Sequence, residues 1–132
     1  MDVVFASNDN YARHLAVAMY SLMDHNQVAE RIRIFILSVD ISRENQEKLS
    51  AVVRRFTREI IFIPMGNLKE KFPYDIETGG FDISTMSRLF IGTMLPEDVE
   101  RVLYLDCDTV VLGSLKKLWN LDLHGKIMGA VL

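Results

Sequence analysis

Two aspartates, Asp106 and Asp108, stand one residue apart in the apolar stretch 101–112. The Val, Leu and Tyr residues before them predict a buried strand. Because an unpaired carboxylate inside a strand is costly, we expect both at its carboxyl end, where open α/β sheets bind ligands. Residues i and i+2 of an extended backbone point the same way, so both carboxylates could bind one hard cation. The alternative is that they only shape a turn.

The elements that must position this pair alternate along the chain. Apolar runs predict strands at 3–7, 32–38 and 59–63, and helical periodicity predicts helices at 11–24 and after Ser42. Three successive strand-helix units indicate a parallel sheet with right-handed crossovers. The fold class we predict is α/β and Rossmann-like, with a mostly parallel sheet of strand order 3-2-1-4 flanked by helices.

The rest of the chain is less regular. Gly and Pro residues mark 66–82 as a long connection, and Ser84 is expected to cap a helix whose inward residues are Met86, Leu89 and Phe90. One helical turn is predicted at 114–119 and a last strand at 126–132. That strand stops without a polar tail, so we expect the chain to be cut from a longer domain. An open apolar sheet edge at 127–132 would also favour a homo-oligomer.

Composition limits the classes of function. The chain has 132 residues, 49% of them hydrophobic and 25% charged, which fits one globular domain. A net charge of −3 without a long basic cluster argues against a nucleic-acid partner, and no stretch is apolar enough for a transmembrane segment. The single cysteine, Cys107, favours a cytoplasmic protein. It lies between the two aspartates, which disfavour a thiolate, so we do not expect a nucleophile.

A second polar group, Ala-Ser-Asn-Asp-Asn-Tyr at 6–11, closes the first strand. In the order 3-2-1-4 the first and fourth strands are neighbours, so this group and the aspartates would flank one crevice. The first turn lacks the Gly-x-Gly-x-x-Gly motif that cradles dinucleotides. We therefore expect the carboxylates to hold a divalent cation that bridges phosphate oxygens. Two alternatives remain open: Asn10 caps the first helix, and Arg88 is a surface ion-pair partner.

Taken together, these residues resemble glycosyltransferase family 8, which includes bacterial lipopolysaccharide galactosyltransferases and glycogenin. The resemblance rests on 6–11, on Ser-Thr-Met-Ser-Arg-Leu at 84–89, on Tyr-Leu-Asp-Cys-Asp at 104–108, and on Leu115 and Trp119 beyond them. It implies a GT-A fold and transfer of a hexose from a UDP-sugar, with retention of configuration, to a saccharide or glycolipid acceptor. Residues 1–132 would be one domain, the N-terminal nucleotide-sugar-binding part of such an enzyme.

The resemblance also implies a role for each site residue. The two aspartates of the Asp-x-Asp motif would bind Mn²⁺, or Mg²⁺ in its place, and the backbone around the intervening cysteine would lie near the ribose. The tyrosine ring of the first group would stack on uracil, and the arginine would contact the sugar-phosphate part of the donor. The nucleotide-sugar site would comprise Ala6, Asn8, Asn10, Tyr11, Arg88, Asp106 and Cys107, and the metal ligands would be Asp106 and Asp108.

Two features depart from the family pattern. Position 8 is Asn where some members have Asp, although an amide still forms hydrogen bonds. Family members are also considerably longer, and their third metal ligand, a histidine, and their acceptor residues lie beyond residue 132. His124 is too close in sequence to Asp108 to match that histidine. We therefore expect this chain to bind donor weakly and to transfer poorly.

Two rival interpretations remain. The sequence Asp-Cys-Asp-Thr-Val from Asp106 also fits the motif of haloacid-dehalogenase-type phosphatases, with Asp106 as nucleophile and Asp108 as general acid. That class needs most of its catalytic domain after the motif, and only a short tail follows here. The other interpretation is a non-catalytic fragment that binds a nucleotide sugar.

Overall fold

The computed structural model describes residues 1–75, 77 and 82–130. Its centre is a parallel sheet of four strands in the order β3-β2-β1-β4, as the sequence predicts. Strands β1 and β2 pair over their whole length, from Asp2 opposite Arg33 to Asn8 opposite Val39. The strands are β1 (Asp2–Asn8), β2 (Arg33–Val39), β3 (Glu59–Pro64) and β4 (Leu103–Tyr104).

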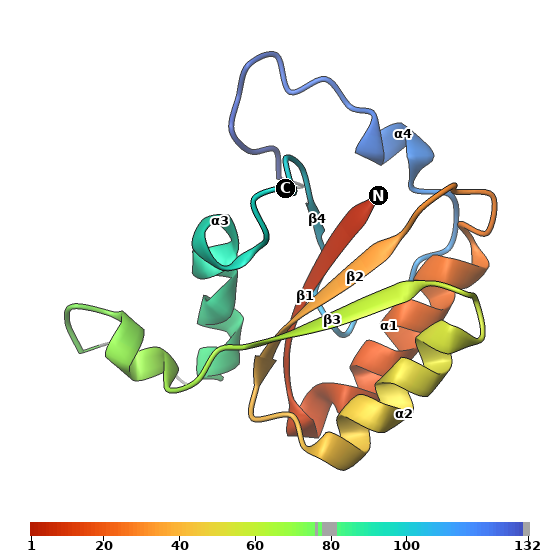
Figure 1. The fold of residues 1–132 in the computed structure, drawn as a ribbon. Coiled ribbons are helices and arrows are strands. Elements are labelled where there is room, and N and C mark those ends of the chain that lie inside the picture. The colour runs from red at the N-terminus through yellow and green to blue at the C-terminus, as the bar shows by residue number, and fades with distance from the viewer. Residues whose placement is uncertain (76, 78–81, 131–132) are drawn as a thin grey trace.

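Both faces of the sheet are covered (Figure 1). The helices α1 (Ala12–Asp24) and α2 (Arg43–Arg54) lie on one face, where the alternate residues Val3 and Phe5 of β1 join their core. Val4 and Ala6 point to the other face, toward the segment that holds α3 (Ile91–Met94). Because β1 is buried on both sides, its sequence is a continuous apolar run, as in other parallel sheets.

On this second face, the prediction of a helix capped by Ser84 is wrong in part. The element is a 3-10 helix, η3 (Ile83–Phe90), and its cap is Asp82, whose carboxylate accepts a hydrogen bond from the Ser84 amide at 2.8 Å. Residues three apart are eclipsed in a 3-10 helix, so Ser84 and Ser87 are buried in one line. Leu89 falls on the opposite side and is 65% exposed, whereas Phe90 packs inward as expected.

The strand predicted before Asp106 is shorter than its apolar residues indicate. Only Leu103 and Tyr104 pair with β1, and the Leu105 amide donates once more, to the Val4 carbonyl at 3.0 Å. After Leu105 the chain turns away from the sheet. Val111 is then buried against α1, whereas Leu112 is exposed, so this hydrophobic run does not mark strand pairing.

The C-terminal part carries the short helix α4 (Lys116–Trp119), which agrees with the predicted turn, but the last predicted strand is wrong. Residues 126–130 form no strand, and Ile127 and Met128 are exposed; residues 131–132 lie outside the described part. Gly79 and Gly80 of the predicted long connection also lie outside it, and its described part includes η2 (Leu68–Lys71). Across the described residues, none of the helices is long and apolar enough to span a membrane.

Candidate functional site

The two polar groups predicted from sequence lie at the same edge of the sheet. Strands β1 and β4 are parallel neighbours, with Val3 opposite Leu103 and Val4 opposite Tyr104. Both strands therefore end at the carboxyl edge, β1 in Asn8 and β4 just before Asp106. Since the strands run in the same direction, everything that follows directly after either one is presented at that edge.

The aspartate pair sits on a tight turn and not on extended backbone, so that part of the prediction is wrong. The Thr109 amide donates to the Asp106 carbonyl at 3.2 Å, and the Thr109 hydroxyl donates to the same carbonyl at 2.8 Å. Asp106 and Asp108 are both exposed, one on each side of the half-buried Cys107. The two aspartates thus form a turn, which was the alternative raised in the sequence analysis, and this turn still exposes both carboxylates to solvent.

The turn is held at both of its ends. Before it, the Leu105 amide is bonded to β1, and after it the Val111 amide donates to the Ser21 hydroxyl of α1 at 3.0 Å. Farther along, the Leu115 amide donates to the Asn26 side chain at 2.8 Å. Ser21 and Asn26 are both buried, so these bonds are shielded from water.

Cys107 in the middle of the turn packs against the core beneath α1. Burial raises the pKa of its thiol, and Asp108 raises it further, while a hydrogen bond with the Ser7 side chain works in the opposite direction. The sequence suggested the effect of neighbouring charge, but desolvation is the larger cause.

Arg88 reaches the aspartate turn from η3. Its guanidinium Nη2 donates to Asp106 Oδ1 at 3.0 Å, and its Nε donates to the Thr85 carbonyl at 2.9 Å. The guanidinium carbon also lies 4.7 Å from the centre of the Tyr104 ring, a cation–π contact. The structure thus brings Arg88 and Asp106 together, in the ion pair that the sequence analysis kept as an alternative.

Tyr104 is a site residue that the sequence analysis did not single out. Its hydroxyl donates to Asp106 Oδ1 at 3.1 Å, so this oxygen accepts from both Tyr104 and Arg88. Burial raises the pKa of Tyr104 well above its ordinary value, which further favours the protonated hydroxyl that donates this bond. An aromatic residue two positions before a carboxylate is common in strands, and its pattern alone carries no signal of this contact.

At the end of β1 the candidate residues divide into buried and exposed ones. Asn8 is buried, and its side-chain oxygen accepts from the Tyr11 amide at 3.2 Å, which caps the 3-10 turn η1 (Asp9–Tyr11). The cap is thus Asn8 and not Asn10, which is exposed. Ala6 is buried in the core with its side chain, so only its backbone is available to a ligand. The Tyr11 ring is 43% exposed beside His14.

The end of β1 is joined to η3 through Asp82. Hydrogen bonds from Ser84, and a smaller one from the Asn8 side chain, hold the pKa of the Asp82 carboxyl below its ordinary value. Asp9 faces the other way, since its carboxylate accepts from the Ser42 amide and the Asn45 side chain, both at 2.8 Å, and so ties β1 to α2. The carboxyl edge is thus framed by η3 on one side and α2 on the other.

The oxygen ligands of this edge fit a divalent cation of the Mg²⁺ or Mn²⁺ type. Both side-chain donors to Asp106 contact Oδ1, and Asp108 is exposed on the same turn. Within residues 1–75, 77 and 82–130, no group of three or more His, Cys, Asp or Glu side chains could hold a metal. Two carboxylates with the remaining positions left to phosphate and water are a common arrangement for such ions.

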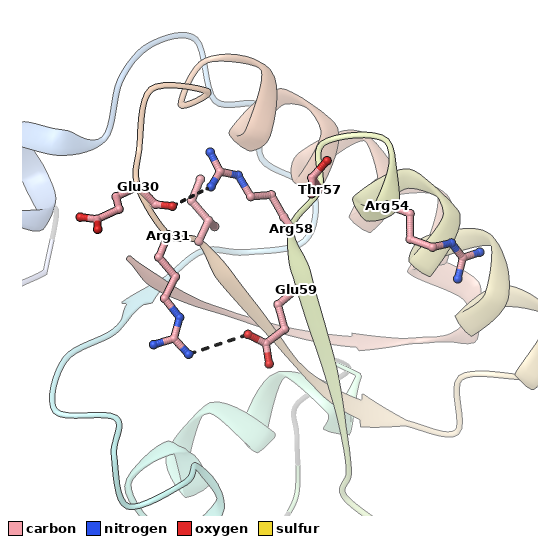
Figure 2. A pocket seen from close by; sticks show the side chains of 7 residues that line it. Glu30, Arg31, Arg54, Thr57, Arg58 and Glu59 are labelled. Atoms are coloured by element: carbon pink, nitrogen blue, oxygen red, sulfur yellow. Dashed lines mark hydrogen bonds and ion pairs between the residues drawn. The ribbon is translucent and has the colours of Figure 1, made fainter.

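A shallow hollow of about 630 Å³ lies at the other end of the sheet (Figure 2). Arg58 closes one wall by donating to the carbonyls of Gln27, Ala29 and Glu30, and Arg31 lies 3.8 Å from Glu59 on the other. Its lining residues come from the segment before β2, the end of α2 and the start of β3, so it sits at the amino ends of these strands, away from the aspartate turn. We therefore assign it no part in the candidate site.

Comparison with known proteins gives a family and a fold. The model of the glycosyl transferase family 8 matches residues 2–132. General stress protein A of Bacillus subtilis is 26% identical over 99% of this chain, and the glycosyltransferase GlyD of Streptococcus pneumoniae is 34% identical over 98%. These matches do not favour the phosphatase alternative.

Solved structures agree. The galactosyltransferase LgtC, in complex with donor and acceptor sugar analogues, is 36% identical and superimposes with a TM-score of 0.78 over 92% of this chain. An active-site mutant of LgtC gives the same TM-score at 37% identity. The predicted GT-A fold is confirmed.

The chain spans less than half of these relatives. It covers 46% of General stress protein A, 15% of GlyD and 43% of LgtC.

Proposed function

Since the chain belongs to glycosyl transferase family 8, we propose that it forms the nucleotide-sugar-binding part of a retaining, metal-dependent glycosyltransferase. The donor is a UDP-hexose and the acceptor is a saccharide or a lipopolysaccharide-type glycolipid. One observation carries the proposal: the Asp106–Asp108 turn stands beside the end of β1 at the carboxyl edge of a parallel sheet. That edge is where α/β sheets bind nucleotides.

Each part of the edge has a task in this proposal. Asp106 and Asp108 hold the cation, and the exposed Tyr11 ring offers a flat apolar surface to uracil. The backbone at Ala6 of β1 and the side chain of Asn10 in η1 contact the uridine, while Asn8 caps η1 and also lines the site. The backbone at Cys107 lies near the ribose.

Glycosyl transfer from a UDP-sugar requires stabilisation of the negative charge on the departing UDP. As the bond between the sugar and UDP breaks, charge builds up on the departing diphosphate, and a bound divalent cation supplies a fixed positive charge there. Arg88 adds a second positive group on the same side, because its guanidinium already lies at the aspartate turn. Tyr104 orients Asp106 through its hydroxyl, which donates to Asp106 Oδ1.

Calorimetric titration of UDP into the chain, with and without Mn²⁺, tests the proposal. We expect binding that depends on Mn²⁺ and that weakens by at least about tenfold in Asp108→Ala, because one of two protein ligands is lost. Glu97→Ala is the matched control, since it removes an exposed carboxylate near the other end of β4. Folded chain that shows no Mn²⁺-dependent UDP binding would contradict the proposal.

A further inference from the structure

The guanidinium of Arg88 is paired with Asp106, a carboxylate that the proposed function assigns to the cation. It donates to Asp106 Oδ1 at 3.0 Å, and the same oxygen accepts from the Tyr104 hydroxyl. Both partners of the ion pair are exposed, Arg88 by 41% and Asp106 by 53% of the side chain. An exposed pair of this kind is weak and is exchanged easily for a stronger partner.

Arg88 has two other contacts that do not depend on Asp106. Its Nε donates to the Thr85 carbonyl within η3, and its guanidinium lies over the Tyr104 ring at 4.7 Å. These contacts keep the guanidinium at the turn even when Nη2 leaves the carboxylate. A planar, always charged group that is held in place but carries a replaceable partner can turn to a phosphate oxygen instead.

The balance of charge says when this exchange is favourable. Asp106, Asp108 and Arg88 together carry one net negative charge. A divalent cation alone would leave the turn net positive, with the guanidinium next to the ion. A cation that arrives with a nucleotide diphosphate brings the anion that both positive groups need.

We propose that Arg88 is a positioning residue that couples cation binding to nucleotide binding. Without nucleotide it pairs with Asp106 and weakens the binding of the bare cation. With nucleotide, the cation takes Asp106 and Arg88 pairs with a phosphate oxygen. This inference rests on the function proposed above. It adds that the site binds cation and nucleotide cooperatively, and by linkage each ligand raises the affinity for the other by the same factor.

The test measures two affinities in wild type and in Arg88→Met. Mn²⁺ alone is titrated and followed by the electron paramagnetic resonance of the free ion, and UDP is titrated calorimetrically at saturating Mn²⁺. We expect Arg88→Met to bind Mn²⁺ alone roughly three- to tenfold more tightly, because a competing charge is gone. We expect it to bind UDP about tenfold more weakly, because a charged hydrogen bond is lost.

Two variants separate this coupling from a general effect of charge. Arg31→Met also removes one arginine that is paired with one carboxylate, Glu59 at 3.8 Å, but at the amino ends of β2 and β3, away from the aspartate turn. It should leave both affinities unchanged. Arg88→Lys keeps the charge and should restore most of the weak binding of Mn²⁺ alone.

Opposite changes in the two affinities support the inference. If Arg88→Met bound both ligands more weakly than wild type, Arg88 would be merely structural. If Mn²⁺ alone bound equally well to both proteins, or to neither, Arg88 would not compete with the cation. Either result overturns the inference. Failure of the proposed function looks different, because wild type itself would then not bind UDP with Mn²⁺.

Discussion

Cys107 is placed between two exposed carboxylates and yet belongs to the core. Its side chain packs beneath the turn, and burial raises the pKa of the thiol above its ordinary value. A thiolate is the reactive form, so the fraction available at neutral pH is smaller than for a free cysteine. The Cys107 side chain thus anchors the aspartate turn to the hydrophobic core.

Alkylation with iodoacetamide measures this directly, because the chain has one cysteine. We expect the folded protein to react several-fold more slowly at pH 8 than the chain unfolded in urea, with the rate rising toward a midpoint above the ordinary thiol pKa. A folded-state midpoint at or below the unfolded one would contradict the burial argument.

For individual residues, the sequence predicted which residue types lie at the carboxyl edge of the sheet, but not which side chains contact one another there. The predicted strand order placed the end of β1 beside the aspartates, but it did not place Arg88, which reaches Asp106 from η3. The contact of Asp82 with the Ser84 amide depends on the 3-10 geometry of η3, and a period of three is easily taken for a helical one.

Among the elements, α1 controls the aspartate turn more than β4 does. Ser21 accepts from the Val111 amide and donates to the Ala18 carbonyl at 2.9 Å, so its hydroxyl satisfies a buried amide of a different segment. Strand β4 pairs with β1 at only two residues. The sequence could not show this division, because an apolar run looks the same whether it pairs in a sheet or packs on a helix.

Removal of this hydroxyl should cost stability. Ser21→Ala leaves the Val111 amide buried without a partner, so we expect the free energy of unfolding to fall by about 1–2 kcal/mol. Urea denaturation followed by circular dichroism measures the change. Ser50→Ala makes the same substitution on α2 and should change the free energy by no more than a few tenths of a kcal/mol. Equal effects of both would show that Ser21 is not an anchor.

For the whole molecule, the amino edge of the sheet is organised by one buried arginine. Arg33 at the start of β2 donates two hydrogen bonds to Asp2 of β1, both at 2.7 Å, and one to Asp98 before β4, at 2.6 Å. The Arg33 side chain is 9% exposed and that of Asp98 is 62% exposed. Hydrogen bonds with Asp2 and Asp98 raise the pKa of Arg33 further above its ordinary value, and Arg33 lowers the pKa of the Asp98 carboxyl.

The two partners should therefore differ in what they contribute. Arg33→Met leaves the Asp2 side chain, which is only 15% exposed, without its cation, and we expect a loss of about 3 kcal/mol in the free energy of unfolding. Asp98→Asn should lose much less, because its carboxylate is largely in water. Its contribution should be present at neutral pH and disappear as the pH falls below about 4, since its folded-state pKa is lowered. Urea denaturation of both variants at pH 7 and pH 3 measures these losses. A larger loss in the free energy of unfolding for Asp98→Asn than for Arg33→Met would contradict this expectation.

The short pairing of β4 has a consequence for how long each half of the edge persists. Strands β1, β2 and β3 share long ladders and most of the core, whereas the segment from β4 onward is joined to them by a two-residue pairing and a few side-chain anchors. Local unfolding can therefore detach this segment while β1, β2 and β3 stay folded. A ligand that contacts both β1 and the aspartate turn would oppose this local unfolding, because it binds only the closed form.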